Sequence, residues 1–163
     1  MVVTILGIIT AIAVPRMTTA SAGATAHSLQ ATLGSVRKAI DCYYAEHNRF
    51  PGYDPANSAT SGEHFVKQLT LYTDRTGNSS PVRANPFLYG PYLRAPFPRN
   101  PTNNLPTVHV KATPGAANPS DGSVGWVAVL STGDFGISAT DGDLDDIGIK
   151  EPSGKDLVRL TVQ

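Results

Sequence analysis

The first part of the chain consists of an apolar segment followed directly by an amphipathic segment. Residues 1–14 read MVVTILGIITAIAV and carry no charged side chain. Further along, apolar or aromatic positions recur at spacings of four and three residues, which place them on one face of a helix. These positions are Leu29, Leu33, Val36, Ile40, Tyr43 and His47. The pattern predicts one long helix over residues 1 to about 48, apolar on all sides at first and one-sided later.

Pro15 interrupts the apolar run, and Arg16 follows it. A proline inside a helix removes one backbone hydrogen bond, so we expect a kink there. At about 1.5 Å per residue the helix would be roughly 70 Å long. A small domain cannot cover a helix of that length, so part of it is expected to lie in lipid or against other subunits. Polar positions suited to its outer face are Gln30, Ser35, Arg37, Lys38, Asp41 and Glu46.

Three interpretations of the apolar segment remain open. A secretory signal peptide would need a basic start, which is missing, although a cut after Ala20 or Ala22 is conceivable. A buried helix of a soluble domain would normally keep a polar face. The third interpretation is a membrane helix whose first residues precede Met1, since the run is shorter than the roughly 20 residues that span a bilayer.

The rest of the chain predicts one short helix and several short strands. Residues 61–74 read SGEHFVKQLTLYTD and predict a helix capped by Ser61, with Phe65, Leu69 and Tyr72 packing on the long helix. Residues 75–106 are rich in Pro, Asn and Gly and predict an extended surface connection. The candidate strands are 107–111, 126–130, 135–139 and 157–162.

These elements predict an α+β fold, in which a long, kinked N-terminal helix packs on a small antiparallel β-sheet. Residues 131–134 read STGD and form a turn signal between the second and third strands. Trp126 is expected to anchor the core of the sheet.

Four motifs resemble type IV pilins and the pseudopilins of type II secretion. The segment ILGIITAIAVPRM (5–17) is similar to the N-terminal signature of this family. The segments YYAEHNRFPGY (43–53), GPYLRAPFPRNP (90–101) and GWVAVLSTGDFGISATDG (125–142) resemble its later motifs, in family order. The family's leader peptide and the glutamate near the start of its mature helix are missing, so we expect the sequence to begin inside the helix.

The resemblance implies a division of the chain at residue 23. Residues 1–23 would be the membrane-anchoring half of the helix, and residues 24–163 a periplasmic pilin-like domain that includes the amphipathic half. The protein would sit in the bacterial inner membrane, after prepilin-type N-terminal methylation, and assemble with its own copies, other pseudopilins, the inner-membrane assembly machinery and lipid. The residues expected in the membrane and filament core are Ile5, Leu6, Gly7, Ile8, Ile9, Ile12, Val14 and Pro15.

Composition and motifs argue against several other functions. A formal net charge of zero does not suit binding to nucleic acid, which favours a basic surface. Cys42 is the only cysteine, so an internal disulfide and a Cys-rich zinc site are excluded. The sequence has no zinc-protease pair of histidines, no nucleophile elbow and no phosphate loop, so no enzymatic activity is expected.

His27 and His47 are expected at an interface or at the surface. Arg16, Arg37 and Lys38 would be solvated or would meet lipid headgroups or carboxylates of neighbours.

An acidic cluster is the only candidate metal site. Asp134, Asp141, Asp143, Asp145 and Asp146 are five of the thirteen acidic residues of the chain. Calcium favours several oxygen ligands from a bent loop. The segment also resembles the calcium loop of the major pseudopilin, with Asp141 and either Asp145 or Asp146 as the matching ligands. The alternative is a solvated acidic loop without a metal.

The function expected from these features is that of a structural subunit of a type II secretion pseudopilus, which supports protein export. One alternative is a subunit of a type IV pilus for adhesion, motility or DNA uptake. An alternative of another class is a membrane-anchored secreted domain that binds a ligand or acts as an enzyme.

Overall fold

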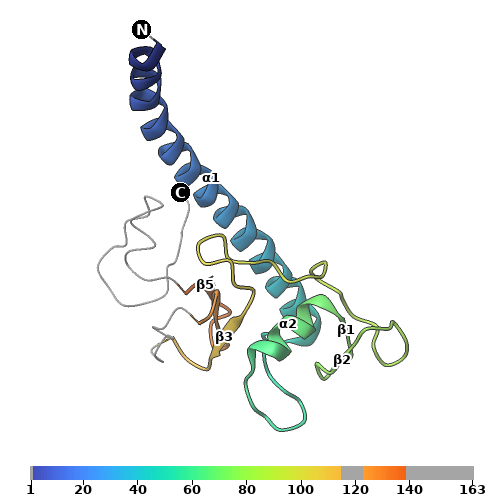
Figure 1. Cartoon of the computed structure of the whole chain (residues 1–163). Coiled ribbons are helices and arrows are strands. Elements are labelled where there is room, and N and C mark those ends of the chain that lie inside the picture. The colour runs from blue at the N-terminus through green and yellow to red at the C-terminus, as the bar shows by residue number, and fades with distance from the viewer. Residues whose placement is uncertain (1, 115–122, 139–163) are drawn as a thin grey trace.

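The structure, a computed structural model, describes residues 2–114 and 123–138, and it describes the side chains of the first helix from Gly23 onward. Helix α1 runs without interruption over Val2–His47. The prediction of one helix to about residue 48 is therefore confirmed. Pro15 lies inside this continuous helix. Figure 1 shows that the helix bends gently along its N-terminal half and extends away from the globular part.

The end of α1 follows from the conformation of Asn48. Its φ of 54° lies in the left-handed region, which short polar residues such as asparagine tolerate at the end of a helix. Its amide donates to the carbonyl of Tyr44 at 2.8 Å, which satisfies one of the last helical carbonyls. The chain then turns back toward the core at Pro51, which is buried.

Helix α2 (Gly62–Thr70) confirms the predicted short helix and its cap. The Ser61 hydroxyl accepts a hydrogen bond from the amide of Glu63 at 3.1 Å. Phe65 and Leu69 are buried as expected. The prediction for Tyr72 was wrong, because the helix ends at Thr70 and Tyr72 begins a strand.

The strands form two small sheets. Strands β1 (Tyr72–Thr73) and β2 (Ser79–Ser80) pair antiparallel. The second sheet has the order β3-β4-β5, with β3 at Val108–Lys111, β4 at Trp126–Val129 and β5 at Phe135–Ile137. The hairpin of β4 and β5 is antiparallel, as predicted from its turn.

The prediction of a wholly antiparallel sheet was wrong, because β3 and β4 pair in parallel, with Val108 opposite Trp126. Residues 112–125 separate the two strands, and a connection of about a dozen residues is long enough to return the chain to the same end of a sheet. Residues 75–106 form loops apart from β2 and isolated bridges, as expected. The predicted strand at 157–162 lies outside the described residues.

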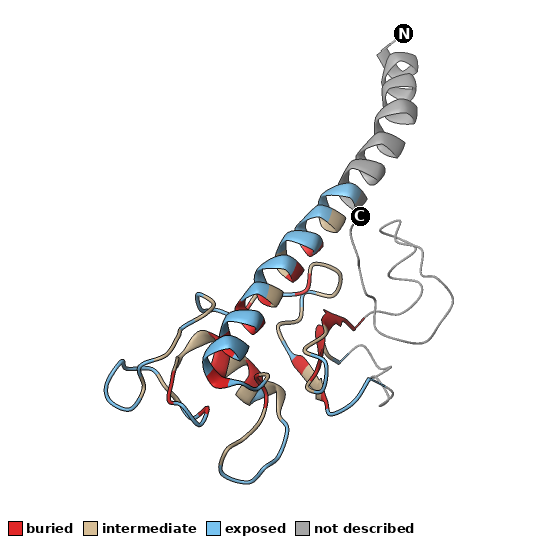
Figure 2. Ribbon diagram, turned by 180° about the vertical axis from the view of Figure 1, so that it is seen from behind, coloured by how far each residue is buried: buried red, intermediate tan, exposed pale blue. Residues whose placement is uncertain are grey.

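The core lies between α1, α2 and the three-stranded sheet, as the buried residues in Figure 2 show. Trp126 is fully buried, and its indole N–H donates to the carbonyl of Pro98 at 3.0 Å. Phe135 stacks on Trp126 and on Phe65, with ring centroids 5.3 Å and 5.7 Å apart. Trp126 is thus the core anchor that the sequence predicted, and the fold is α+β with one long helix.

Candidate functional site

Helix α1 has one face that the domain covers and one face that it leaves open. All six positions predicted to face the core are buried: Leu29, Leu33, Val36, Ile40, Tyr43 and His47. Most polar positions predicted for the outer face are exposed: Gln30, Ser35, Lys38, Asp41 and Glu46. The globular part therefore covers a single stripe of the helix, beginning at Leu29.

Arg37 departs from the prediction for the outer face. It is half-buried, and its Nε and Nη2 both donate to the carbonyl oxygen of Phe135, at 3.2 Å and 2.8 Å. Because β5 is the outer strand of its sheet in the described part of the chain, this side chain joins the edge of the sheet to α1. The expectation that Arg37 is solvated or meets lipid or a neighbour was wrong. Lys38 is exposed, and the side chain of Arg16 lies outside the described residues.

The uncovered side of α1 carries small side chains among polar and charged ones such as His27, Lys38 and Asp41. We call its small exposed residues the open face: Gly23, Ala24, Ser28, Ala31, Gly34, Ser35 and Cys42. A Cβ atom added at Gly23 or Gly34 would meet no other atom within 4 Å, so both glycines border open space. Small side chains allow the backbones of two helices to approach closely. At these small residues of the open face, the backbone of α1 can be approached closely.

The N-terminal part of α1 projects beyond the globular part, as Figures 1 and 2 both show. The residues predicted for the membrane and filament core have a helical backbone there, and their side chains lie outside the described ones: Ile5, Leu6, Gly7, Ile8, Ile9, Ile12, Val14 and Pro15. Among helical residues that the structure describes in full, no stretch is both long and apolar enough to cross a membrane.

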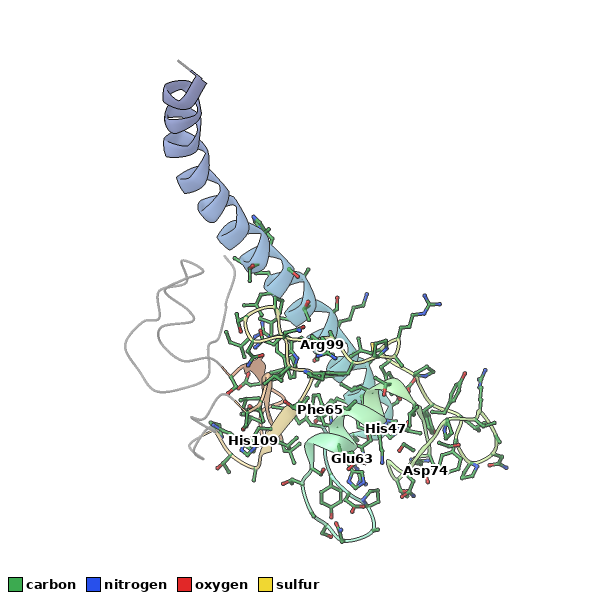
Figure 3. The ribbon with its side chains drawn as sticks, in the orientation of Figure 1. His47, Glu63, Phe65, Asp74, Arg99 and His109 are labelled. Atoms are coloured by element: carbon green, nitrogen blue, oxygen red, sulfur yellow. The ribbon has the colours of Figure 1, made fainter. Side chains whose placement is uncertain are left out.

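His47 fastens the C-terminal end of α1 to the following loops. It is 7% exposed and stacks on Tyr43, with ring centroids 4.0 Å apart. Its Nε2 lies 2.9 Å from the carbonyl oxygen of Asp74, and Figure 3 shows both residues near the end of the helix. The expectation that His47 lies at an interface or at the surface was wrong, because its ring fills the gap between α1 and β1. His27 is exposed, as expected.

Two tyrosines complete this cluster. The hydroxyl of Tyr92 donates to the Glu46 carboxylate, and burial together with this carboxylate raises the pKa of Tyr92 far above its ordinary value. Burial likewise raises the pKa of Tyr43, whose hydroxyl has no hydrogen-bond partner among the described residues. Both phenols therefore keep their protons at neutral pH. Tyr92 acts as a hydrogen-bond donor that joins the loop of residues 81–107 to α1.

Asp74 organises the turn between β1 and β2. Its Oδ1 accepts hydrogen bonds from the amides of Thr76, Gly77 and Asn78 at 2.8 to 3.0 Å. Its Oδ2 accepts one from the side-chain amide of Asn78 at 2.8 Å. Burial raises the pKa of Asp74, but these hydrogen bonds outweigh burial and hold the pKa below its usual value. The sequence analysis missed this turn, although the run Asp-Arg-Thr-Gly-Asn is rich in turn-forming residues.

The predicted calcium ligands Asp141, Asp145 and Asp146 lie outside the described residues. Asp134, the described member of the acidic cluster, accepts a hydrogen bond from the Thr132 hydroxyl at 2.7 Å within the β4–β5 turn. Within residues 2–114 and 123–138, no group of three or more His, Cys, Asp or Glu side chains gathers in a way that could hold a metal ion.

Comparisons with protein-family models, with curated proteins and with solved structures find no match to this chain.

Proposed function

We propose that this protein is a structural subunit of a type II secretion pseudopilus, anchored and assembled through α1. The observation that carries the proposal is the mismatch between helix and domain. Helix α1 extends over Val2–His47, whereas the domain covers one stripe of it, from Leu29 onward. Under this proposal the N-terminal half packs in lipid or in the filament core, and the open face of the other half packs against neighbouring subunits.

The sequence of the projecting half specifies the chemistry of that partner. Residues 1–14 carry no charge, and burying one isoleucine or leucine side chain away from water contributes about 1.5–3 kcal/mol. The helix would first lie in the inner membrane and later pass into the core of a filament, so its apolar surface stays away from water in both states. The function is association, in which no covalent bond is made or broken.

Two features favour the pseudopilus over a type IV pilus. The only cysteine is Cys42, so no cysteine pair stands near the C-terminus, and Asp141 to Asp146 form an acid-rich segment. The proposed partners are copies of the same chain, other pseudopilins, the inner-membrane assembly machinery and lipid. The proposed location is the inner membrane, with the globular domain in the periplasm and calcium held by Asp141 with Asp145 or Asp146.

Membrane fractionation tests the anchoring role. The full chain, produced in bacterial cells, is expected to remain in the membrane pellet after an alkaline carbonate wash, which releases peripheral proteins. The double variant Ile8→Asp/Ile12→Asp is expected in the soluble fraction, because each aspartate at the centre of a membrane helix costs about 2.5–3.5 kcal/mol.

A matched control places the same two charges on the other half of the helix. The variant Gln30→Asp/Ser35→Asp changes two exposed positions of α1 and should pellet like the unaltered chain. Release of the unaltered chain by carbonate would contradict the proposal, and so would equal release of both variants.

A further inference from the structure

A groove crosses the surface between α2 and the loop that leads into β3. It encloses about 800 Å³ and is lined by apolar side chains that include Val66, Phe97 and Val108. At one part of the groove α2 begins close against β3, where a Cβ atom on Gly62 would lie 1.8 Å from the carbonyl oxygen of Val108. A groove of this size accepts a few apolar side chains of a ligand.

Charged side chains lie at the edges of this groove. Lys67 pairs with Glu63 at 2.6 Å, while Arg99 is exposed and uses one nitrogen, Nη1, to donate to the carbonyl of Asn104 at 2.8 Å. Figure 3 labels Glu63 on α2 and Arg99 on the loop. A guanidinium group has five N–H donors, so Arg99 keeps donors for a further carboxylate.

Arg99 lies in a stretch of the sequence that has no acidic residue. Residues 75–120 contain no aspartate or glutamate but include Arg75, Arg83, Arg94 and Arg99. In the described part of the chain the ion pairs are His64 with Asp54 and Lys67 with Glu63, so none of these arginines is paired with a carboxylate there. The fitting ligand therefore combines carboxylates with apolar side chains.

The chain itself contains a segment with this composition. Residues 143–149 read DLDDIGI and combine three aspartates with the apolar residues Leu144, Ile147 and Ile149. The apolar side chains match the apolar lining, and the carboxylates match Lys67 and Arg99 at its edges. The proposed calcium site shares these aspartates, so the contact is proposed for the segment without calcium. Because the formal net charge of the chain is zero, copies do not repel one another as they would with a large net charge.

We propose that the groove between α2 and the loop of residues 96–107 binds residues 143–149 of a second copy of this chain. The inference rests on the proposed function, because a filament places the globular domains of neighbouring copies side by side. It adds a contact between globular domains to the contact between helices. This second contact would set the register of neighbouring subunits.

A charge exchange between two chains tests this contact. The full chain is prepared in detergent micelles with a chelator, and energy transfer is measured between copies labelled at Ala56→Cys in a Cys42→Ser background. The variants Lys67→Glu/Arg99→Glu and Asp145→Lys/Asp146→Lys should each lose self-association by roughly tenfold or more, because each then opposes like charges. Mixing the two variants should restore it, because the reversed charges again attract.

The control is Arg75→Glu/Arg83→Glu, which makes the same change of charge at two arginines that do not line the groove. It should associate like the unaltered chain. The proposal is overturned if the mixture does not regain self-association, or if the control loses as much self-association as the groove variant. It is also overturned if the groove variant keeps its self-association and loses only the ability to bind vesicles of anionic lipid. Carbonate-resistant membrane binding depends on α1 and should be unchanged in all variants, so a failure of the groove contact is distinguishable from a failure of the anchoring function.

Discussion

Gln68 connects three backbone groups inside the domain. Its Nε2 donates to the carbonyls of Tyr53 and Gly77, both at 2.8 Å, and its Oε1 accepts from the amide of Gly52 at 2.7 Å. The side chain is 1% exposed, so water cannot replace these bonds. Gln68→Leu should lower the free energy of unfolding by about 2–4 kcal/mol, because it leaves buried polar groups unpaired. Urea denaturation measures the loss.

Gln30→Leu is the matched control, since Gln30 is exposed on α1. Its unfolding free energy should change by less than about 0.5 kcal/mol. Equal losses in the two variants would show that the Gln68 bonds do not stabilise the domain.

Asp74 gives a prediction about pH. Its pKa in the folded protein is lowered, so its contribution to stability is complete above the pKa of an unfolded aspartate, about 3.9, and is lost as pH falls through the lower folded value. Asp74→Asn should therefore be less stable than the unaltered protein at pH 7, by about 1–2 kcal/mol. The difference should shrink below about pH 4. Denaturation curves measure this difference in unfolding free energy. If it stays constant from pH 7 to pH 3, the Asp74 carboxylate does not stabilise the turn as described.

At the scale of the element, the β4–β5 hairpin depends on one glycine. Gly133 has a φ of 74°, and a Cβ atom there would lie 2.2 Å from the ring of Phe50. Gly133→Ala should therefore lower the free energy of unfolding by more than about 1 kcal/mol, through backbone strain and overlap with the ring.

Gly34→Ala is the opposite case within α1. Gly34 borders open space, and alanine favours a helix interior over glycine by about 0.5–1 kcal/mol. This variant should melt at a higher temperature than the unaltered protein, while Gly133→Ala melts at a lower one. A lower melting temperature for both would contradict the environments described for the two glycines.

The sequence predicted elements better than it predicted contacts between them. The buried face of α1 was predictable because helix periodicity is a local property of the sequence. The Ser61 cap was predictable because it lies next to the helix that it starts. The parallel pairing of β3 with β4 was not, since strand direction depends on the path of residues 112–125. The hydrogen bonds of Arg37 to Phe135 and of Tyr92 to Glu46 join residues that are far apart in the chain. A local sequence pattern could therefore not predict them.

At the scale of the whole molecule, the account concerns what covers α1. The domain packs on one stripe of the helix, from Leu29 to His47, and the proposed function assigns the projecting half and the open face to other copies and lipid. Bulky side chains on the open face should therefore weaken assembly while the domain stays folded. Gly34→Trp is expected to keep the melting temperature within a few degrees of the unaltered protein and to lose self-association.

Cysteine cross-linking in bacterial membranes tests whether copies assemble through α1. In a Cys42→Ser background, Ala31→Cys lies on the open face, and Ala56→Cys lies on an exposed loop away from it. Oxidation should join copies through the cysteine at position 31 into covalent dimers, and should leave the chains with the cysteine at position 56 monomeric. Efficient cross-linking at position 56 with none at position 31 would contradict assembly through α1.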